Sequence, residues 1–453
     1  MEQFDLLIMG GGPGGYSLAA AAAKKGLKTA VFEKGVLGGT CLNVGCIPTK
    51  YLVDKALTMD KVKNLSKRGI YAAPLTVNFE KVQKGKEMVV KKLTSGVKLL
   101  LDAAGVTTIY GEAVLKPDRV VECGGECFQG KNVVIATGSE TMVIPIPGHE
   151  LCITSTDVLN MTEIPKSMVV MGGGVIGLEL ACAFQAFGTK VSVVEMLPAL
   201  LPNNERAAVD QLVSHIKKLG VKLYVGAKML RVEKAEEGLK AVFEKDGAET
   251  AVDCEQVLMA VGRKASLSGI DAEALGLELE RRCVKVDAHQ RTNLPGVYAI
   301  GDAAGGLQLA HAAYAEGERA LHDMLGGEVP APGPIPACVY TLPCFASVGL
   351  STAQAEAAGF KPLLGTFEYS NNGMALAEGA SGTVYVVADE ASKKTLGVTI
   401  VGENASEMIG MATLAVQDGM TLDEWENTVV AHPSLCEMMK EAALDCFGAA
   451  IHK

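Results

Sequence analysis

The stretch "DLLIMGGGPGGYSLAAAAAKKGLKTAVFEK" (residues 5–34) has the order strand, glycine turn, helix, strand. A second stretch, "SMVVMGGGVIGLELACAFQAFGTKVSVVEM" (residues 167–196), has the same order. In both, a G-x-G-x-x-G pattern is followed by a helix-ending glycine 11 residues after its third glycine, and a glutamate ends the second strand 23 residues after the first. One such pattern is a weak signal, whereas two copies with the same spacing indicate two dinucleotide-binding units in one α/β chain.

Each position of the repeated pattern has a physical reason. The first glycine allows a tight turn, the second lets a pyrophosphate approach the backbone, and the third lets the helix pack on the strand. The helix N-terminus offers unpaired N–H groups and a positive dipole end to the phosphates. Glu33 and Glu195 end the second strands, where a carboxylate accepts from ribose hydroxyls. Because a carboxylate at Glu195 repels a 2′-phosphate, the second unit is predicted to prefer NAD to NADP.

The stretch "GGTCLNVGCIPTK" (residues 38–50) holds Cys41 and Cys46 within a run of glycines. Zinc-binding pairs usually have two residues between the cysteines and a second pair elsewhere, and no second pair is evident. No metal site is therefore predicted. The other standard use is a dithiol that opens and closes as a disulfide, which needs an electron source beside it.

Composition excludes several classes of protein. The chain has 453 residues, 49% hydrophobic and 21% charged, which is typical of a globular protein with more than one domain. A formal net charge of −10 argues against nucleic-acid binding. No segment approaches the roughly 18 apolar residues of a membrane span, and the start "MEQFDLLIMG" is not a secretory signal. The 12 cysteines then indicate reduced thiols in the cytoplasm, where a Cys41–Cys46 disulfide would be catalytic.

The stretch "NLPGVYAIGDAAGGLQLAHAAYAEG" (residues 293–317) indicates which dinucleotide the first unit binds. Its strand ends at Gly301–Asp302, and a helix is predicted from about Leu309. Asp302 at the carboxyl end of a strand is well placed to accept from a polyhydroxyl chain such as the ribitol of FAD. We therefore expect FAD in the first unit and NAD in the second.

The remaining segments of the chain indicate further secondary structure and a domain boundary. Residues 45–105 have helical spacing, and a hairpin is predicted to turn at Gly124–Gly125, where Cys123 and Cys127 could face each other. The proline-rich stretch at 326–340 marks a boundary, and strands are predicted in "GTVYVVADE" and "TLGVTIVG" beyond it. Cys182 and Cys254 are expected in the core.

Taken together, these motifs resemble the flavoprotein disulfide reductases, the class I pyridine nucleotide-disulfide oxidoreductases, over nearly the whole length. Further motifs of that family are "ATGS" (136–139) and "AHPSLCE" (431–437), and Leu-Asn after Cys41 is typical of its dihydrolipoamide dehydrogenase branch. The resemblance implies an α/β fold with two Rossmann-like domains, for FAD and NAD, and a C-terminal α+β dimerisation domain. The expected boundaries are 1–143 and 263–333 for the two parts of the FAD domain, 144–262 for the NAD domain and 334–453 for the interface domain.

The resemblance also implies an activity. It predicts a homodimeric oxidoreductase with tightly but non-covalently bound FAD that reoxidises dihydrolipoyl groups with NAD. The partner would be the lipoyl carrier protein of a 2-oxoacid dehydrogenase, glycine cleavage or similar system. Mercuric reductase and glutathione reductase-like enzymes are alternatives from the same family. An NADH oxidase or peroxidase is a more distant alternative, as is a non-enzymatic scaffold that keeps FAD for structure alone.

Catalytic roles follow from matching the family's motifs onto this sequence. Cys46, at a helix start, would be the thiol that faces the flavin, and Cys41 the thiol that attacks the substrate. Lys50 would lie by the flavin and pair with Glu179. His432 would be the general base, oriented by Glu437 and offered to the dithiol of the partner chain.

The expected cofactor contacts form two sets. For FAD they are Gly10, Gly12, Pro13, Gly14, Gly15, Glu33, Lys34, Gly39, Thr40, Lys50, Gly111, Ala136, Thr137, Gly138, Gly301, Asp302, Gln308, Leu309, Ala310 and His311. For NAD they are Gly172, Gly174, Val175, Ile176, Gly177, Glu179, Glu195, Met229 and Gly262.

Three positions depart from the family pattern, and Cys436 stands out for where it lies. "AVGRKAS" (260–266), which contains Ala265, lacks the proline and asparagine common in the family after Gly-Arg. Met374 stands where an arginine is common, and Val430 where a histidine is often found. Cys436 lies between His432, the expected general base, and Glu437, so its thiol would be close to the active site.

Overall fold

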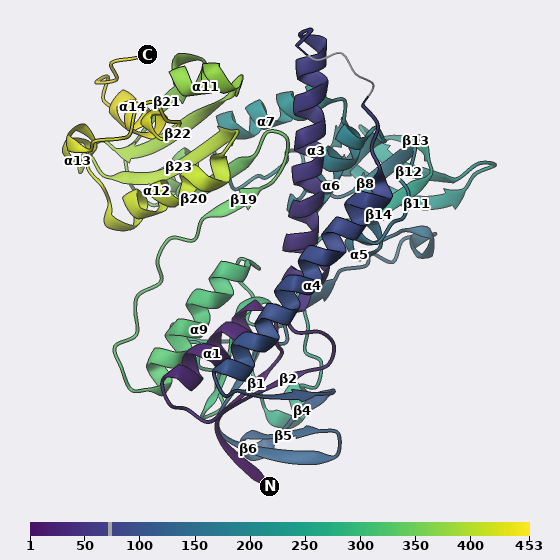
Figure 1. Cartoon of the computed structure of the whole chain (residues 1–453), viewed down its shortest axis with the longest axis vertical. Coiled ribbons are helices and arrows are strands. Elements are labelled where there is room, and N and C mark those ends of the chain that lie inside the picture. The colour runs from purple at the N-terminus through teal and green to yellow at the C-terminus, as the bar shows by residue number, and fades with distance from the viewer. Residues whose placement is uncertain (71–74) are drawn as a thin grey trace.

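The computed structural model describes residues 1–70 and 75–453 (Figure 1). Its first part is built on a seven-stranded sheet of order β3-β2-β1-β6-β5-β4, in which β18 pairs with β6. Strands β1, β2, β3 and β18 run parallel to one another and to β6, whereas β4, β5 and β6 form an antiparallel meander. The strands are β1 (Glu2–Met9), β2 (Thr29–Glu33), β3 (Thr107–Tyr110), β4 (Ala113–Lys116), β5 (Val120–Cys123), β6 (Glu126–Ile135) and β18 (Val297–Ala299).

Helices cover this sheet because its central strands are apolar on both faces. Leu6, Leu7 and Ile8 of β1 are all fully buried, as expected for a strand inside a parallel sheet. Helices α1 (Pro13–Lys24) and α9 (Ala310–Met324) pack against each other, and Pro13 at the first helical position is preset for a helix start. The chain returns to the first sheet at β18, which runs parallel to β1. The Gly301–Asp302 turn after β18 and the glycine turn after β1 therefore lie at the same edge of the sheet.

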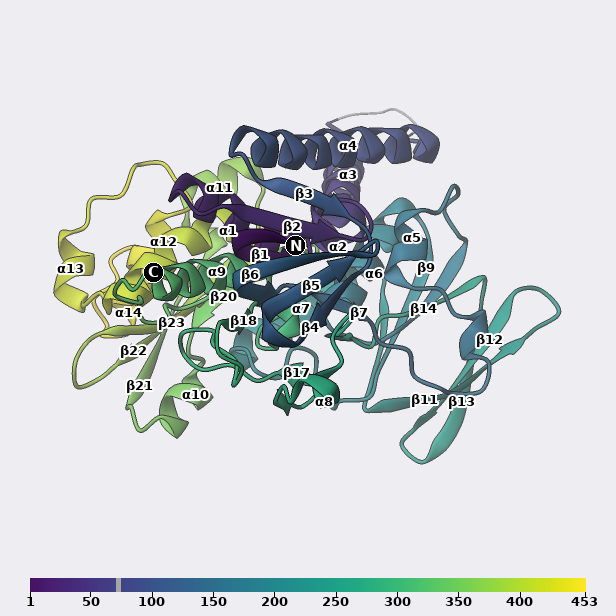
Figure 2. The same ribbon diagram turned by 90° about the horizontal axis from the view of Figure 1, so that it is seen from below.

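The second part repeats the first on a smaller scale. A parallel sheet of order β10-β9-β8-β14 carries α6 (Val175–Phe187) between β8 and β9. An antiparallel sheet, β11-β12-β13, projects from it (Figure 2). The other elements here are β8 (Ser167–Met171), β9 (Lys190–Glu195), β10 (Lys222–Val225), β11 (Ala227–Lys234), β12 (Leu239–Lys245), β13 (Ala248–Cys254), β14 (Gln256–Met259), α5 (Ser155–Leu159) and α7 (Arg206–Leu219).

The third part is an antiparallel sheet of order β19-β20-β23-β22-β21 covered by helices. Trp425 and Tyr369 are buried in its own core. Glu205 joins it to the second part, since its carboxylate accepts from the amide and hydroxyl of Thr352 at 2.9 and 2.8 Å. Its elements are β19 (Ala337–Val339), β20 (Phe345–Gly349), β21 (Pro362–Glu368), β22 (Gly382–Asp389), β23 (Thr395–Gly402), α10 (Thr352–Ala357), α11 (Gly373–Glu378), α12 (Ala405–Asp418), α13 (Leu422–Asn427) and α14 (Glu437–Asp445).

Two long helices stand between these parts (Figure 1). They are α3 (Cys46–Lys67), which packs on α6, and α4 (Phe79–Ala103). They confirm most of the helical prediction for 45–105, although its residues 71–74 lie outside the described chain. Among short elements, β7 (Ser139–Thr141) pairs with β15 (Arg263–Ala265), α2 (Gly39–Val44) precedes α3, and α8 (Ala272–Leu275) and the β16–β17 hairpin (Leu279–Glu280, Cys283–Val284) lie in the central segment.

The prediction that Cys123 and Cys127 could face each other is wrong. The hairpin turns at Gly124–Gly125 as expected, but Cys123 pairs with Glu126, and Cys127 pairs with Glu122. Cys123 is buried and Cys127 exposed, since this register sends their side chains to opposite faces. Cys182 and Cys254 lie in the core as predicted, and burial raises their pKa to about 12 and about 11.

Within the described residues, no helix combines the length and apolar character needed to cross a bilayer. The fold is α/β with two similar parallel-sheet units and a C-terminal α+β unit, as the sequence predicted. The exact domain boundaries stay predictions.

Two glycines of the second motif are predicted to have different roles, Gly177 in folding and Gly174 in cofactor binding. A Cβ on Gly177 would lie 2.1 Å from the carbonyl oxygen of Gly172, so Gly177→Ala should destabilise this part of the protein by about 2–3 kcal/mol. Gly174 has a φ of −80°, and a Cβ there would meet no atom within 4 Å. Gly174→Ala should therefore fold normally but raise KM for NAD about tenfold, by filling the place where a pyrophosphate approaches. Calorimetry and initial-rate kinetics of both variants test this, and equal stability of the two would contradict it.

Candidate active site

A cavity of about 1480 Å³ lies where the first two parts meet α2 and α3. Both glycine turns, the Cys41–Cys46 segment and the Gly301–Asp302 turn line it. The residues expected to hold FAD or NAD all line it except Gly15 and Gly177. Those two face the turns instead, since a Cβ on them would lie 1.9 and 2.1 Å from the carbonyl oxygens of Gly10 and Gly172. The structure thus brings the two predicted sets together around one space.

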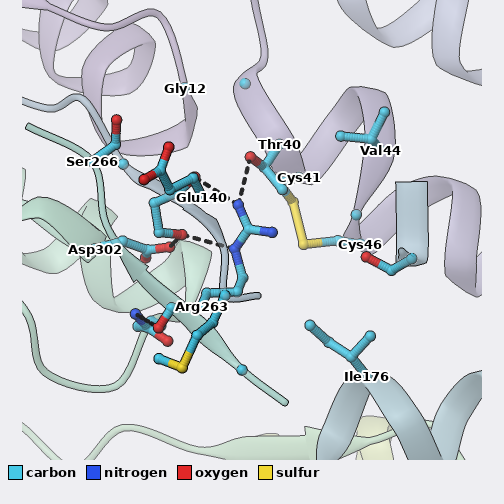
Figure 3. A pocket seen from close by; sticks show the side chains of 18 of the residues that line it. Gly12, Thr40, Cys41, Val44, Cys46, Glu140, Ile176, Arg263, Ser266 and Asp302 are labelled. Carbon is cyan, nitrogen blue, oxygen red and sulfur yellow. Dashed lines mark hydrogen bonds between the residues drawn. A yellow bond between two sulfur atoms is a disulfide. The ribbon is translucent and has the colours of Figure 1, made fainter. Parts of the chain in front are cut away.

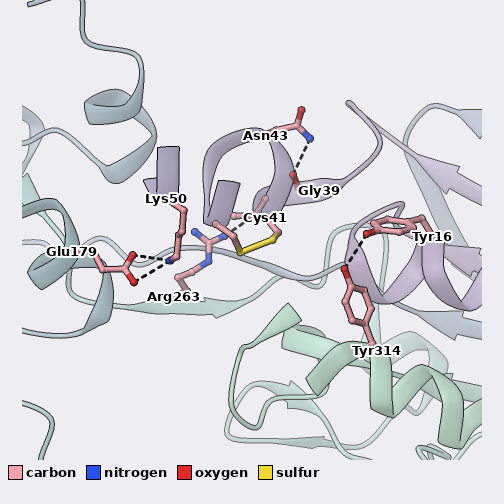
Figure 4. Close-up of a disulfide and its surroundings, with 10 residues drawn as sticks. Tyr16, Gly39, Cys41, Asn43, Lys50, Glu179, Arg263 and Tyr314 are labelled. Atoms are coloured by element: carbon pink, nitrogen blue, oxygen red, sulfur yellow. Dashed lines mark hydrogen bonds and ion pairs between the residues drawn. A yellow bond between two sulfur atoms is a disulfide. The ribbon is translucent and has the colours of Figure 1, made fainter. Parts of the chain in front are cut away.

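The cavity contains a disulfide between Cys41 in α2 and Cys46, the first residue of α3, with their Cα atoms 4.6 Å apart (Figure 4). The side-chain amide of Asn43 holds this segment by donating to the carbonyl oxygens of Gly39 and Leu37, at 2.9 and 3.2 Å. On reduction, a thiolate at Cys46 would lie at the positive end of a helix of 22 residues, which stabilises it. The two cysteines therefore have unequal environments.

An ion pair connects the disulfide helix to the helix of the second glycine motif (Figure 4). Nζ of Lys50 lies 3.0 and 2.9 Å from the two carboxylate oxygens of Glu179 in α6. Glu179 is 2% exposed and also accepts from the amide of Tyr340, at 3.0 Å. The Lys50 ammonium lies 4.5 Å from the centre of the Tyr340 ring, a favourable cation–π contact. Three segments that are distant in sequence thus meet at one buried carboxylate.

The two glycine turns bind their strand-end glutamates in the same way. Glu33 accepts from the amides of Gly11 and Gly35 at 2.9 and 2.7 Å, and Glu195 accepts from those of Gly173 and Leu197 at 2.6 and 2.7 Å. The repeat seen in the sequence is therefore also a repeat of hydrogen bonds.

The residues present fit the two cofactors. A Cβ on Gly39 would lie 2.7 Å from Cα of Gly12, so only glycine lets the disulfide segment approach the first turn this closely. Gly12 itself presents bare backbone at the start of α1, and Gly174 does the same at the start of α6. Unpaired helix N–H groups beside an open backbone are what a pyrophosphate needs.

Arg263 is a residue of the cavity that the sequence analysis missed (Figure 3). Its guanidinium donates to the hydroxyl and carbonyl oxygens of Ser139, at 2.8 and 2.6 Å, and to the hydroxyl of Thr40, at 3.3 Å. The Ser139 hydroxyl in turn donates to the carboxylate of Asp302. Burial lowers the pKa of Arg263, while the charges of Asp302 and Glu140 oppose that shift.

These contacts make Arg263 the link between the disulfide segment and the Asp302 turn. Its signal in the sequence was the Gly-Arg of "AVGRKAS", directly before the positions that depart from the family pattern. The contact depends on the pairing of β15 with β7, which brings Arg263 beside Ser139 and which no local pattern announces.

The predicted pair of His432 and Glu437 is formed, but it does not lie beside the disulfide. Nδ1 of His432 lies 2.9 Å from Glu437, which also accepts from the amide of Ser434 at 2.9 Å. Burial alone would raise the pKa of Glu437, but the Ser434 amide and His432 outweigh it and hold that pKa below its usual value. The His432 side chain is 78% exposed, and in the described part of the chain neither residue lines the disulfide cavity. One chain alone does not bring this base to its own dithiol.

The departures from the family pattern leave the cavity intact. Ala265 ends β15, and the next residue, Ser266, donates its amide to the carbonyl oxygen of Gly138 at 2.9 Å. Met374 packs against the core of the third part, and Val430 is half-buried. Cys436 directly precedes α14, and burial raises the pKa of its thiol.

The comparisons with known proteins agree with this geometry. The model of the pyridine nucleotide-disulphide oxidoreductases matches residues 4–317, and the model of their dimerisation domain matches residues 335–443. The chain belongs to this family. It is therefore a flavoprotein oxidoreductase with FAD and NAD as cofactors, and a homodimer.

Curated relatives and a solved structure show which members of the family the chain is similar to. The chain is 40% identical to a dihydrolipoyl dehydrogenase of Chlorobaculum tepidum, covering 98% of this chain and 97% of the relative. It is 35% identical to a dihydrolipoyl dehydrogenase of Bacillus subtilis, covering 99% of each. A solved structure, the HOCl-induced flavoprotein disulfide reductase RclA from Escherichia coli, matches with a TM-score of 0.87 at 26% identity, over 97% of this chain and 99% of that one.

The Lys50–Glu179 pair should respond unequally to loss of its two partners. Lys50→Met leaves a buried carboxylate without its cation and should destabilise the protein by about 3 kcal/mol. Glu179→Gln keeps an acceptor for the Tyr340 amide and leaves a lysine that reaches water, so its cost should be about 1 kcal/mol. Lys55→Met, which removes an exposed pair with Asp54 from the same helix, is the matched control and should cost less than about 0.5 kcal/mol. Chemical denaturation measures all three, and equal costs for the first two would refute the argument.

Proposed function

We propose that this chain is a dihydrolipoyl dehydrogenase, which reoxidises a dihydrolipoyl group on a carrier protein with NAD as the acceptor. The observation that carries the proposal is the Cys41–Cys46 disulfide, which lies in one cavity with two dinucleotide cradles. The full-length similarity to dihydrolipoyl dehydrogenases supports it.

The reaction is a transfer of two electrons by thiol–disulfide exchange. A substrate thiolate attacks Cys41, breaks the Cys41–Cys46 bond and leaves Cys46 as a thiolate. The second substrate thiol then attacks the mixed disulfide and releases the lipoyl disulfide and the Cys41 thiol. FAD, when bound, carries the electron pair from the dithiol to NAD, so that one dihydrolipoyl group and one NAD⁺ give one lipoyl group, NADH and a proton.

His432 of the partner chain is the proposed base for this exchange. An imidazole oriented by a carboxylate accepts the proton of the incoming thiol near neutral pH. Glu437 holds the imidazole through Nδ1, so Nε2 is the atom that receives the proton. Because the pair lies outside the cavity of its own chain and in the segment that matches a dimerisation domain, the partner's dithiol is its proposed target.

The proposed cofactor contacts follow the two cradles. Gly10, Gly12 and Glu33, with Asp302, would hold FAD, and Gly172, Gly174 and Glu195 would hold NAD. The other expected contacts, apart from Gly15 and Gly177, line the same cavity. Arg263, poised between Thr40 and Ser139, joins the proposed FAD set.

Particular residues disfavour the rival reactions. Glu195 places a carboxylate where NADP-dependent reductases need a cation, which disfavours a glutathione reductase-like activity. An NADH oxidase needs one reactive cysteine and leaves the second cysteine of the disulfide unexplained.

The proposed partner is the lipoyl carrier protein of a 2-oxoacid dehydrogenase, glycine cleavage or similar system. The proposed compartment is the cytoplasm, because the ten cysteines outside the disulfide are all unpaired in the described chain, as in a reducing environment. Rates measured with a panel of purified lipoylated carriers would identify the system served.

Anaerobic titration of the holoenzyme tests the function. NADH should bleach the bound flavin, and oxidised lipoamide should restore its colour; glutathione disulfide and Hg²⁺ should do so far more slowly. Recovery with glutathione disulfide but not with lipoamide would assign the enzyme to the other branch.

Cofactor choice should depend on Glu195. Glu195→Arg should raise KM for NAD at least tenfold and lower KM for NADP, because it replaces a ribose acceptor by a phosphate partner. Glu195→Gln, which keeps an acceptor for the Gly173 or Leu197 amide, is the control and should weaken NAD binding without creating NADP use. A wild-type enzyme that already prefers NADPH in initial-rate assays would show the assignment to be wrong.

A further inference from the structure

Helix α14 carries the carboxylates of two histidine–carboxylate pairs, one helical turn apart. Glu437 and Glu441 are four residues apart and so lie on the same face. Glu437 accepts from His432, and Glu441 accepts from Nδ1 of His452 at 2.8 Å. The last residues of the sequence lie beside this helix (Figure 1).

Main-chain amides support both pairs in the same way. Glu437 accepts from the amide of Ser434, and Glu441 accepts from the amides of Ile451 and His452 at 2.9 and 3.3 Å. The Glu441 side chain is only 10% exposed, so its charge needs these partners. The second pair is thus a built feature of the fold, although the proposed reaction gives it no role.

The two pairs are close enough to interact electrostatically. Burial alone would raise the pKa of Glu441, but His452 and the two amides outweigh it and hold the pKa below its usual value. The charge of His452 also contributes, after Ser434 and His432, to the lowered pKa of Glu437. Because Glu437 and Glu441 lie one turn apart on the same face of α14, a charge on the second pair acts on the first.

We propose that His452 is a positioning residue for the catalytic base: its imidazolium form, hydrogen-bonded to Glu441, offsets the charge of that carboxylate and so sets how readily His432 takes up a proton. This inference rests on the proposed role of His432 as the base. His452 acts through Glu441 and Glu437 and touches no reacting atom.

The sign of the effect follows from the charges. Without His452, the Glu441 carboxylate has no imidazolium partner to offset its charge, and it stabilises the imidazolium form of His432 more strongly. The base then stays protonated to a higher pH. In a plot of kcat/KM against pH, the rise on the acid side (the acid limb) therefore shifts to higher pH. Without the negative charge of Glu441, the imidazolium form of His432 loses a nearby carboxylate, and the limb moves down. When both charges are removed, the limb returns to its original place.

The other titratable groups around α14 are either bonded to partners of their own or exposed to solvent. On the packed strands, Asp389 of β22 is bonded to Ser392, the Tyr385 hydroxyl to Gln211, and Glu368 of β21 to Ser370. On α13, Glu424 caps its own helix at Thr421, and Asp423 and Glu426 are exposed; on α14, Lys440 donates to the carbonyl oxygens of Glu426 and Thr428. Lys453 pairs with Asp445. In the described chain, none of these side chains makes an ion pair or hydrogen bond with His432 or His452.

The test compares charge variants of the holoenzyme that keep the hydrogen-bonding shape. His452→Gln, Glu441→Gln and the double variant are measured for kcat/KM with dihydrolipoamide between pH 5.5 and 9, at low and high salt. His452→Gln should raise the midpoint of the acid limb by about 0.4 pH unit at low salt, and Glu441→Gln should lower it. The double variant should restore the wild-type midpoint, and high salt should shrink the single-variant shifts.

Two controls separate charge from structure. His289→Gln removes a histidine that pairs with Asp323 in the first part, and should leave the limb unchanged. NADH oxidation by ferricyanide needs no proton transfer at the dithiol, so its profile should not move in any variant. An acid limb that stays in place in His452→Gln, or a double variant that keeps the His452→Gln shift, would overturn the inference.

A second readout keeps the inference separate from the proposed function. With ¹³C-labelled histidine, NMR titration follows His432 directly among the seven histidines, assigned by the loss of its signal in His432→Gln. A shifted titration of His432 in His452→Gln supports the coupling even if wild-type enzyme fails to oxidise dihydrolipoamide, a result that would count against the proposed function alone. An unshifted titration would overturn the coupling whatever the substrate.

Discussion

The Lys50–Glu179 ion pair is the contact on which the arrangement of the cavity depends. Lys50 lies one helical turn after Cys46 in α3, and Glu179 lies in the first turns of α6, directly after the second glycine motif. The pair therefore fixes the dithiol helix against the NAD cradle, and the amide of Tyr340 ties the third part to the same carboxylate. Because Glu179 is buried, the protein tolerates the charge only while Lys50 and Tyr340 hold it.

A second constraint orders the other side of the cavity. A Cβ on Gly39 would lie 2.7 Å from Cα of Gly12, so the disulfide segment has no room for a side chain where it meets the first glycine turn. Arg263 and Ser139 then connect this point to Asp302 at the end of β18. The disulfide thus lies between two supports, an ion pair toward the second cradle and a hydrogen-bond chain toward the first. That placement suits a dithiol that exchanges electrons with one cofactor and passes them toward another.

Local pattern was enough to predict the parts that depend on local backbone geometry. The two glycine turns, the helix start at Cys46 and the hairpin at Gly124–Gly125 each follow from a few adjacent residues. The family resemblance supplied the Lys50–Glu179 and His432–Glu437 pairs, which the structure forms. The pairing of strands could not be predicted from local sequence. The register of β5 and β6 places Cys123 and Cys127 on opposite faces, and the pairing of β15 with β7 brings Arg263 beside Ser139. The clamp of Glu441 on residues 451 and 452 likewise depends on how the chain folds back over α14.

The central claim is that the dithiol of one chain works with the histidine of the other, and mixed dimers test it most directly. Cys46→Ser and His432→Gln chains, each inactive alone, would be unfolded, mixed and refolded with FAD. Random pairing makes about half the dimers mixed, each with one intact site, so about a quarter of wild-type dihydrolipoamide activity should return. Activity near zero, with mixed dimers confirmed by native mass spectrometry, would contradict the shared site, since a base acting within its own chain leaves every site of the mixture without one essential group.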